Sequence, residues 1–147
     1  MKMMTTIFIA LFLLVPCGGE AKTLSPSTPA DYAYALQTVN SFLWAWVNRD
    51  ADTGKLLISH SLSLKLQKEN NEGWFRDYMV GVSNPHHHSF EIGLGKTLNS
   101  NRMSFPVVLY ELYTGEAKAF KYKSRIEVVL DGDSWKVDRL PITSGDK

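Results

Sequence analysis

The chain has little cysteine, little charge imbalance and none of the common catalytic motifs, and each absence excludes a class of protein. Its 147 residues contain one cysteine, so no disulfide can form within the chain. The formal net charge of +1 gives no electrostatic basis for binding nucleic acid. The sequence lacks a phosphate loop, a dinucleotide fingerprint, G-x-S-x-G and a zinc-protease helix motif. We therefore expect no cofactor.

What is present is an ordinary globular composition, with 44% hydrophobic and 21% charged residues. This is enough apolar material for one hydrophobic core, and the length suits one domain. Aromatic residues make up 12% of the chain, so some of them are available to line a cavity or an interface.

The N-terminal segment, residues 1–21, has the composition of a secretory signal peptide. Lys2 precedes an apolar run from Met3 to Val15, and small residues follow as far as Ala21. The run is shorter than the about 20 apolar residues that a membrane helix needs, and no later segment is apolar enough to span. The sequence therefore predicts an exported protein, periplasmic or extracellular, that is cleaved after Ala21.

Cys17 supports a second interpretation of the same segment. It follows the letters LVP and precedes Gly18, which resembles the lipobox of bacterial lipoproteins. Acylation of Cys17 would place the chain on a membrane through lipid rather than through protein. A small residue normally stands where this chain has Pro16, so plain export is favoured. A lipid-anchored component of envelope assembly remains the alternative.

Residues 22–30 are rich in Ser, Thr and Pro and are expected to form a linker before a single domain at 31–147. A helix start overlaps the end of this linker. Thr28 is a suitable N-cap, Pro29 suits the first turn, and Asp31 complements the positive end of a helix.

Helical periodicity dominates the first half of the domain. Apolar residues recur at helical spacing from the predicted start to about Arg49. A break follows, in which Asp50 is expected to cap a short second helix that ends with the letters LLI. A third, less regular helical segment is expected from Leu62 to Met79, because asparagines and Gly73 interrupt its pattern.

The second half of the domain has a period of two, which predicts strands separated by turns. Short turns join neighbouring strands antiparallel. Pro106 lacks an amide donor, so we expect it at a sheet edge or a bulge. Helices followed by an antiparallel meander predict an α+β fold with the helices on one sheet face. The expected strands are 87–98, 103–113, 119–130 and 134–140.

Three segments together resemble the NTF2-like superfamily. The letters FLWAWVNRD, LLISHSL and YKSRIEVVLDGDSWKVDRL are similar to its first helix, its second helix and its last hairpin. The resemblance spans 30–142 and is closest to small exported domains of bacterial envelopes. It implies a curved sheet wrapped round the helices as a cone with a pocket. The superfamily contains isomerases, dehydratases and protein-binding modules, so the fold does not determine the function.

Three histidines stand side by side in the letters NPHHHSF. In a strand, His86 and His88 would share one face and could supply two ligands to a divalent ion. His60 or Glu91 would then have to supply the third ligand. The favoured interpretation is that the histidines form a solvated strand entry, and a metal site remains a hypothesis.

Five aromatic residues are candidates for lining the pocket of the cone, with plain core packing as the alternative. Pockets are mostly apolar, so these residues would suit a small apolar ligand. The candidates are Trp46, Trp74, Phe75, Tyr78 and Phe90.

Trp44 lies off the apolar stripe of the first helix, beside polar residues. Tryptophan is favoured at interface centres, so we interpret Trp44 as a contact with a protein partner, including a second copy in a homodimer. Partial burial under a loop is the alternative.

An acid–base site is the rival hypothesis. The helical layer offers titratable groups that isomerases, dehydratases or hydrolases could use, although none aligns with a catalytic dyad of the superfamily. The sequence therefore favours a non-enzymatic binding module of the bacterial envelope over a pocket enzyme. The candidate groups are Asp50, Asp52, Asp77, His60 and Tyr78.

Overall fold

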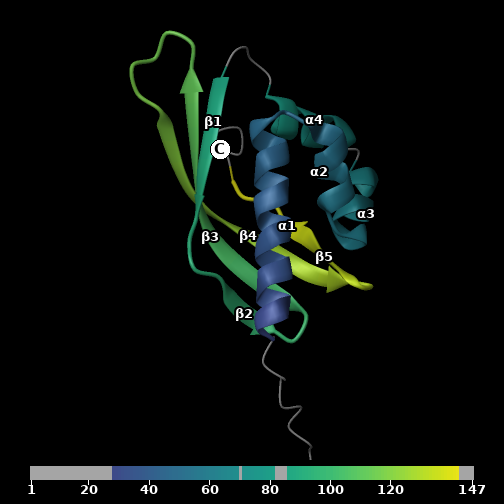
Figure 1. Cartoon of the computed structure of the whole chain (residues 1–147). Helices are drawn as coiled ribbons and strands as arrows, with labels where there is room; N and C mark the ends of the chain where they lie inside the picture. The colour runs from purple at the N-terminus through teal and green to yellow at the C-terminus, as the bar shows by residue number, and fades with distance from the viewer. Residues whose placement is uncertain (1–27, 70, 82–85, 143–147) are drawn as a thin grey trace, which may run out of the picture.

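The computed structural model describes residues 28–69, 71–81 and 86–142, which form helices packed into the hollow of a curved antiparallel sheet (Figure 1). The helices are α1 (Pro29–Val47), α2 (Ala51–Leu57), α3 (His60–Lys68) and α4 (Glu72–Val80). The strands are β1 (His86–Ile92), β2 (Lys96–Asn99), β3 (Arg102–Tyr113), β4 (Phe120–Asp131) and β5 (Ser134–Arg139).

The sheet has the order β1–β3–β4–β5, and β2 pairs with the same strand, β3, as β1 does. Neighbouring strands are antiparallel, so the predicted meander and α+β class are confirmed. Helix α1 lies along the hollow of the sheet, and α2, α3 and α4 lie beside it (Figure 1).

Helix α1 begins where the sequence predicts, and a reciprocal capping box fixes its start. The side chain of Thr28 accepts a hydrogen bond from the amide of Asp31 at 3.1 Å, and the Asp31 carboxylate accepts one from the amide of Thr28 at 2.9 Å. Pro29 and Ala30, which composition assigns to the linker, are the first residues of the helix.

The end of α1 and the start of α2 are set by two adjacent residues. Arg49 has a φ of 58°, which is left-handed and stops the helix, so α1 ends at Val47 rather than at Arg49. Asp50 caps α2 as predicted, because its carboxylate accepts hydrogen bonds from the amide of Thr53 at 2.9 Å and from its hydroxyl at 2.6 Å.

The predicted third helical segment, from Leu62 to Met79, is two helices. Helix α3 ends at Lys68 and α4 begins at Glu72, so the irregular stretch between them is a true break. Asn71 is the N-cap residue of α4, and its side chain forms no capping hydrogen bond.

The predicted strand 87–98 is likewise two strands, because Gly93 and Gly95 interrupt it. Pro106 lies opposite this break, and its carbonyl accepts a hydrogen bond from the amide of Gly93 at 2.8 Å. Of the two positions expected for Pro106, a sheet edge is wrong, since β3 is paired on both sides, whereas the expected irregularity is present, because the pairing breaks opposite Pro106. At the break no hydrogen bond from an amide of β3 is needed, so the missing amide of Pro106 costs no hydrogen bond of the sheet.

The core lies between α1, α4 and the hollow face of the sheet. Alternate residues of β3 point inward, so its apolar positions pack against the helices. The largest fully buried side chains include Phe42, Leu43, Trp46, Met79, Met103, Phe105, Leu109 and Ile126.

The opposite face of the sheet carries an ion-pair network. The Arg102 guanidinium donates to Asp138 at 2.6 Å and to Glu127 at 3.3 Å, and the hydrogen bond to Asp138 raises the pKa of Arg102 above its ordinary value. The Ser59 hydroxyl also donates to Asp138, at 2.5 Å. Because Ser59 caps α3, this network joins the helical layer to the sheet.

Candidate functional site

The hollow of the sheet is occupied by packed side chains and by the chain that follows β5. Trp46 is 1% exposed, and its indole stacks on the ring of His88 with centroids 4.2 Å apart. The hydroxyl of the buried Tyr78 donates to the carbonyl of Pro141 at 3.1 Å. The amide of Ile142 donates to the hydroxyl of Ser124, on the inner face of β4, at 2.7 Å.

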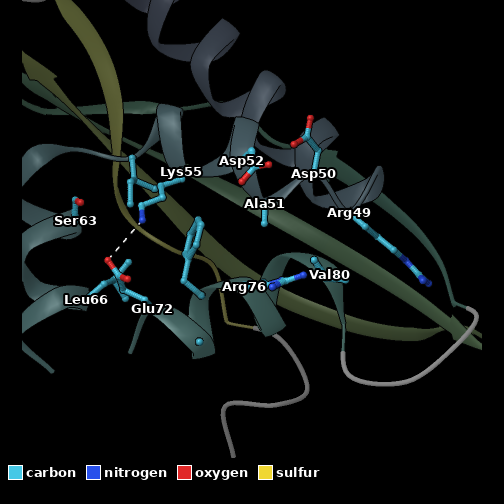
Figure 2. A pocket seen from close by; sticks show the side chains of 13 residues that line it. Arg49, Asp50, Ala51, Asp52, Lys55, Ser63, Leu66, Glu72, Arg76 and Val80 are labelled. Carbon is cyan, nitrogen blue, oxygen red and sulfur yellow. Dashed lines mark hydrogen bonds and ion pairs between the residues drawn. The ribbon is translucent and has the colours of Figure 1, made fainter. Parts of the chain in front are cut away.

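A cavity of about 610 Å³ lies on the helical side of the molecule. It is lined by α2, α3, α4 and the residues just before α2, without any residue of a strand (Figure 2). Its apolar lining comes from Ala51, Ile58, Leu66, Phe75 and Val80. Its charged lining comes from Arg49, Asp50, Asp52, Lys55, Glu72 and Arg76.

Two of these charges are paired across the cavity. Lys55 of α2 lies 3.5 Å from Glu72 of α4, and both side chains are 55% exposed, so the pair is a weak surface salt bridge (Figure 2). Asp50 is occupied by its capping role. The hydroxyl of Thr53, and then its amide, hold the pKa of Asp50 below its ordinary value of 3.8.

Of the other three charged residues of the lining, Arg49, Asp52 and Arg76, the last two bear on binding. In the part of the chain that the structure describes, neither side chain forms a hydrogen bond or an ion pair. They line one cavity with opposite charges but are not paired with each other. Sequence reasoning identified Asp52 and missed Arg76, because a solvent-exposed arginine on a helix has no signal in the hydrophobic pattern.

The five aromatic residues expected in one pocket are separated by the fold. Phe75 lines the 610 Å³ cavity, and Trp74 lines another hollow between α3 and the end of β5. Trp46 and Tyr78 lie in the core. Phe90 is half-buried under Trp44, with ring centroids 5.5 Å apart.

Trp44 is 52% exposed beside the edge strand β1. Its indole meets Phe90 edge-on, at an interplanar angle of 79°, so one part of the ring is packed and the rest faces solvent. Its role in a protein interface or a homodimer stays a prediction.

The histidines occupy three different settings. His60 begins α3, where its amide donates to the carboxylate of Asp131 at 2.7 Å. His87 is exposed, whereas His88 is half-buried against Trp46, so the solvated strand entry describes His87 and not His88. The described residues hold no group of three or more His, Cys, Asp or Glu side chains that could bind a metal. The side chain of His86 lies outside them, and the metal hypothesis stays a prediction.

A polar cluster lies at one end of the inner sheet face. Glu111 is 6% exposed, and the hydroxyl of Tyr113 donates to its Oε2 at 2.7 Å. The cross-strand neighbours of Glu111 are His88 on β1 and Phe120 on β4. Sequence reasoning missed Glu111, although the period of two along β3 places it on the same face as the buried Leu109.

Residues 1–21, with the predicted signal peptide and Cys17, lie outside the described residues. None of the described helices is long and apolar enough to cross a membrane.

No family model matches the sequence, and no curated protein matches it. Two solved structures from Nostoc punctiforme are similar in fold. The first, a domain of unknown function with a cystatin-like fold, has a TM-score of 0.59 and 12% identity over 76% of this chain and 75% of that one. The second, a protein of unknown function with a cystatin-like fold, has a TM-score of 0.56 and 9% identity over 77% of this chain and 90% of that one.

These similarities show the fold alone, since the identities are 12% and 9%. Helices followed by a curled antiparallel sheet form the cystatin-like or NTF2-like cone that the sequence resemblance implies. The functions of both neighbours are unknown, so the function of this chain is argued from its own cavity.

Proposed function

We propose that this protein is an exported, non-enzymatic binding module of the bacterial cell envelope, with the cavity between α2, α3 and α4 as its binding site. The lining of that cavity carries the proposal. At about 610 Å³ the cavity falls within the size of small-molecule sites, roughly 300–1,000 Å³. It combines an apolar floor with polar groups at its rim, which is the usual make-up of a binding site.

The state of the charged groups favours binding over chemistry. General acid–base catalysis needs a group that titrates near the working pH. Asp50 is held ionised by Thr53, because a lowered pKa favours the charged form of a carboxylate. Lys55 and Glu72 are more than half exposed and paired with each other. Asp50, Lys55 and Glu72 therefore already have partners within the protein.

The role of the cavity as a binding site is tested by a substitution that places a large side chain in its wall. Gly73 lines the cavity, and a Cβ there would meet no atom within 4 Å, so Gly73→Trp places a large side chain at the cavity wall from a position with room for its Cβ. We expect small molecules from a fragment collection to shift backbone amide signals of α2, α3 and α4 in NMR spectra, and Gly73→Trp to abolish those shifts.

The matched control is Leu94→Trp, at a position that is 86% exposed between β1 and β2. This variant should retain the binding of the wild-type protein. If the fragments bind elsewhere, or if both tryptophan variants behave alike, the cavity is not the binding site.

Export is tested by the mass of the mature chain from its own host. The signal-like composition of residues 1–21 supports cleavage after Ala21, so the mature protein should begin at Lys22. A chain that begins at an acylated Cys17 would instead support the lipid-anchored alternative. A chain that retains Met1 would contradict export.

A pocket enzyme is the second candidate, and the cluster around Glu111 is the observation that favours it. Glu111, a carboxylate that is 6% exposed and accepts a hydrogen bond from Tyr113 at 2.7 Å, is the candidate general base. Such an enzyme should incorporate deuterium from heavy water into enolisable ketones. Glu111→Gln should abolish that exchange, and a wild-type protein without exchange would remove this candidate.

A further inference from the structure

The charges that line the 610 Å³ cavity are balanced, which limits the net charge of the ligands that it can bind. Its lining carries three cationic side chains, Arg49, Lys55 and Arg76, and three anionic ones, Asp50, Asp52 and Glu72. An anionic ligand would meet three carboxylates, and a cationic ligand would meet three cations. The lining therefore favours neither sign of net charge and suits a ligand that carries both.

Only part of this charge is available to a ligand. Lys55 and Glu72 are paired, Asp50 accepts from Thr53, and Arg49 extends outward from the other labelled side chains (Figure 2). The side chains of Asp52 and Arg76 form no hydrogen bond or ion pair with other described residues. They come from different helices, α2 and α4, and carry opposite charges to the same cavity.

The floor between these charges is apolar. Phe75 is 5% exposed and Leu66 is 7% exposed, so both belong to the core and present only a small apolar surface to the cavity. An apolar side chain of a ligand would gain hydrophobic contact there at about 25 cal/mol per Å² of buried surface.

We infer that the cavity binds a zwitterionic amino acid or dipeptide with an apolar side chain, an inference that rests on the proposed function. Asp52 receives the ammonium group, and Arg76 receives the carboxylate through its paired N–H donors. The apolar side chain lies against Phe75 and Leu66. Asp52 and Arg76 are too far apart for an ion pair with each other, so a ligand with separated charges bridges them.

The inference is tested with four probes in calorimetric or NMR titrations. Leucine carries both charges, N-acetyl-leucine lacks the ammonium, leucinamide lacks the carboxylate, and the dipeptide Leu-Leu has both charges farther apart. We expect leucine or Leu-Leu to bind, and each blocked analogue to bind about fivefold to tenfold more weakly than leucine. Whichever of leucine and Leu-Leu binds more tightly shows whether the ligand is an amino acid or a dipeptide.

Two substitutions assign the charges. In Asp52→Asn the difference between leucine and N-acetyl-leucine should disappear, and in Arg76→Gln the difference between leucine and leucinamide should disappear. Both residues are exposed, so Arg76→Gln should unfold at the temperature of the wild-type protein. Asp52→Asn removes an acidic side chain from the first turn of α2, so it should lower the free energy of unfolding by no more than about 1 kcal/mol.

Two results would overturn the inference. One is equal binding of all four probes, and the other is retention of both differences in the two variants. If no probe binds while other fragments still shift cavity amides in a Gly73→Trp-sensitive manner, the ligand class is wrong and the binding function stands. If no molecule of any class binds in the cavity, the proposed function fails as well.

Discussion

Gly95→Ala is expected to lower the free energy of unfolding by about 2–3 kcal/mol, as overpacking of a rigid core does. A Cβ at position 95 would overlap the ring of Phe105, which is fully buried. The backbone cannot move away freely, because the amide of Gly95 donates to the hydroxyl of Tyr32 at 3.1 Å. Tyr32 in turn packs on Phe105, with ring centroids 5.5 Å apart. Urea unfolding measures the change.

The control for this prediction is Gly73→Ala in α4. A Cβ at position 73 would meet no atom within 4 Å, and alanine favours the helical conformation by up to about 1 kcal/mol. This variant should therefore be as stable as the wild-type protein or more stable. An unchanged unfolding midpoint for Gly95→Ala would contradict the close approach of the chain to Phe105.

Trp46→Ala is expected to cost about 3–5 kcal/mol, because it leaves a cavity at the centre of the core. Trp46 is 1% exposed and joins α1 to β1 through its stacking on His88. Trp44→Ala, two residues earlier in the same helix, should cost no more than about 1 kcal/mol, since Trp44 is 52% exposed. Urea unfolding measures the free energy of unfolding of both variants. Equal decreases in the two variants would contradict the orientation of α1, which buries Trp46 and exposes Trp44.

Local interactions explain why much of the fold could be predicted from the sequence. The caps at Thr28 and Asp50 join residues three apart, so they are visible in the sequence and are confirmed. The antiparallel meander follows from the period of two and from short turns, one of which contains Gly132 with a φ of 63°. These features depend on near neighbours in the chain.

Predictions failed where a distant segment decides the local structure. The break at Gly93 and Gly95 was missed because its cause is a ring and a carbonyl of β3, about ten residues away. For Pro106 the sequence predicts a sheet edge or a bulge, and the edge alternative fails because the fit of Pro106 to an interior strand depends on that same break. The edge of a sheet is a property of strand order, which the position of one proline does not reveal.

In the candidate site, too, single residues could be predicted from the sequence but contacts between distant segments could not. Asp50, Asp52 and Phe75 were identified as polar or aromatic residues of the helical layer, but their grouping was not. The cavity combines residues from 49 to 80 on three helices, and its charged members look like ordinary solvated residues in the sequence. Only the packing of α2, α3 and α4 brings Asp52 and Arg76 to one cavity.

By itself the sequence determined the succession of helices and then strands, the caps of α1 and α2, the turns and the α+β class, because each depends on residues close together in the chain. The tertiary structure alone decided that the hollow of the sheet is packed around Trp46 and that the charged cavity opens among the helices. The physical reason is that burial and charge pairing depend on contacts between segments that are distant in the sequence, and local periodicity carries no record of those contacts.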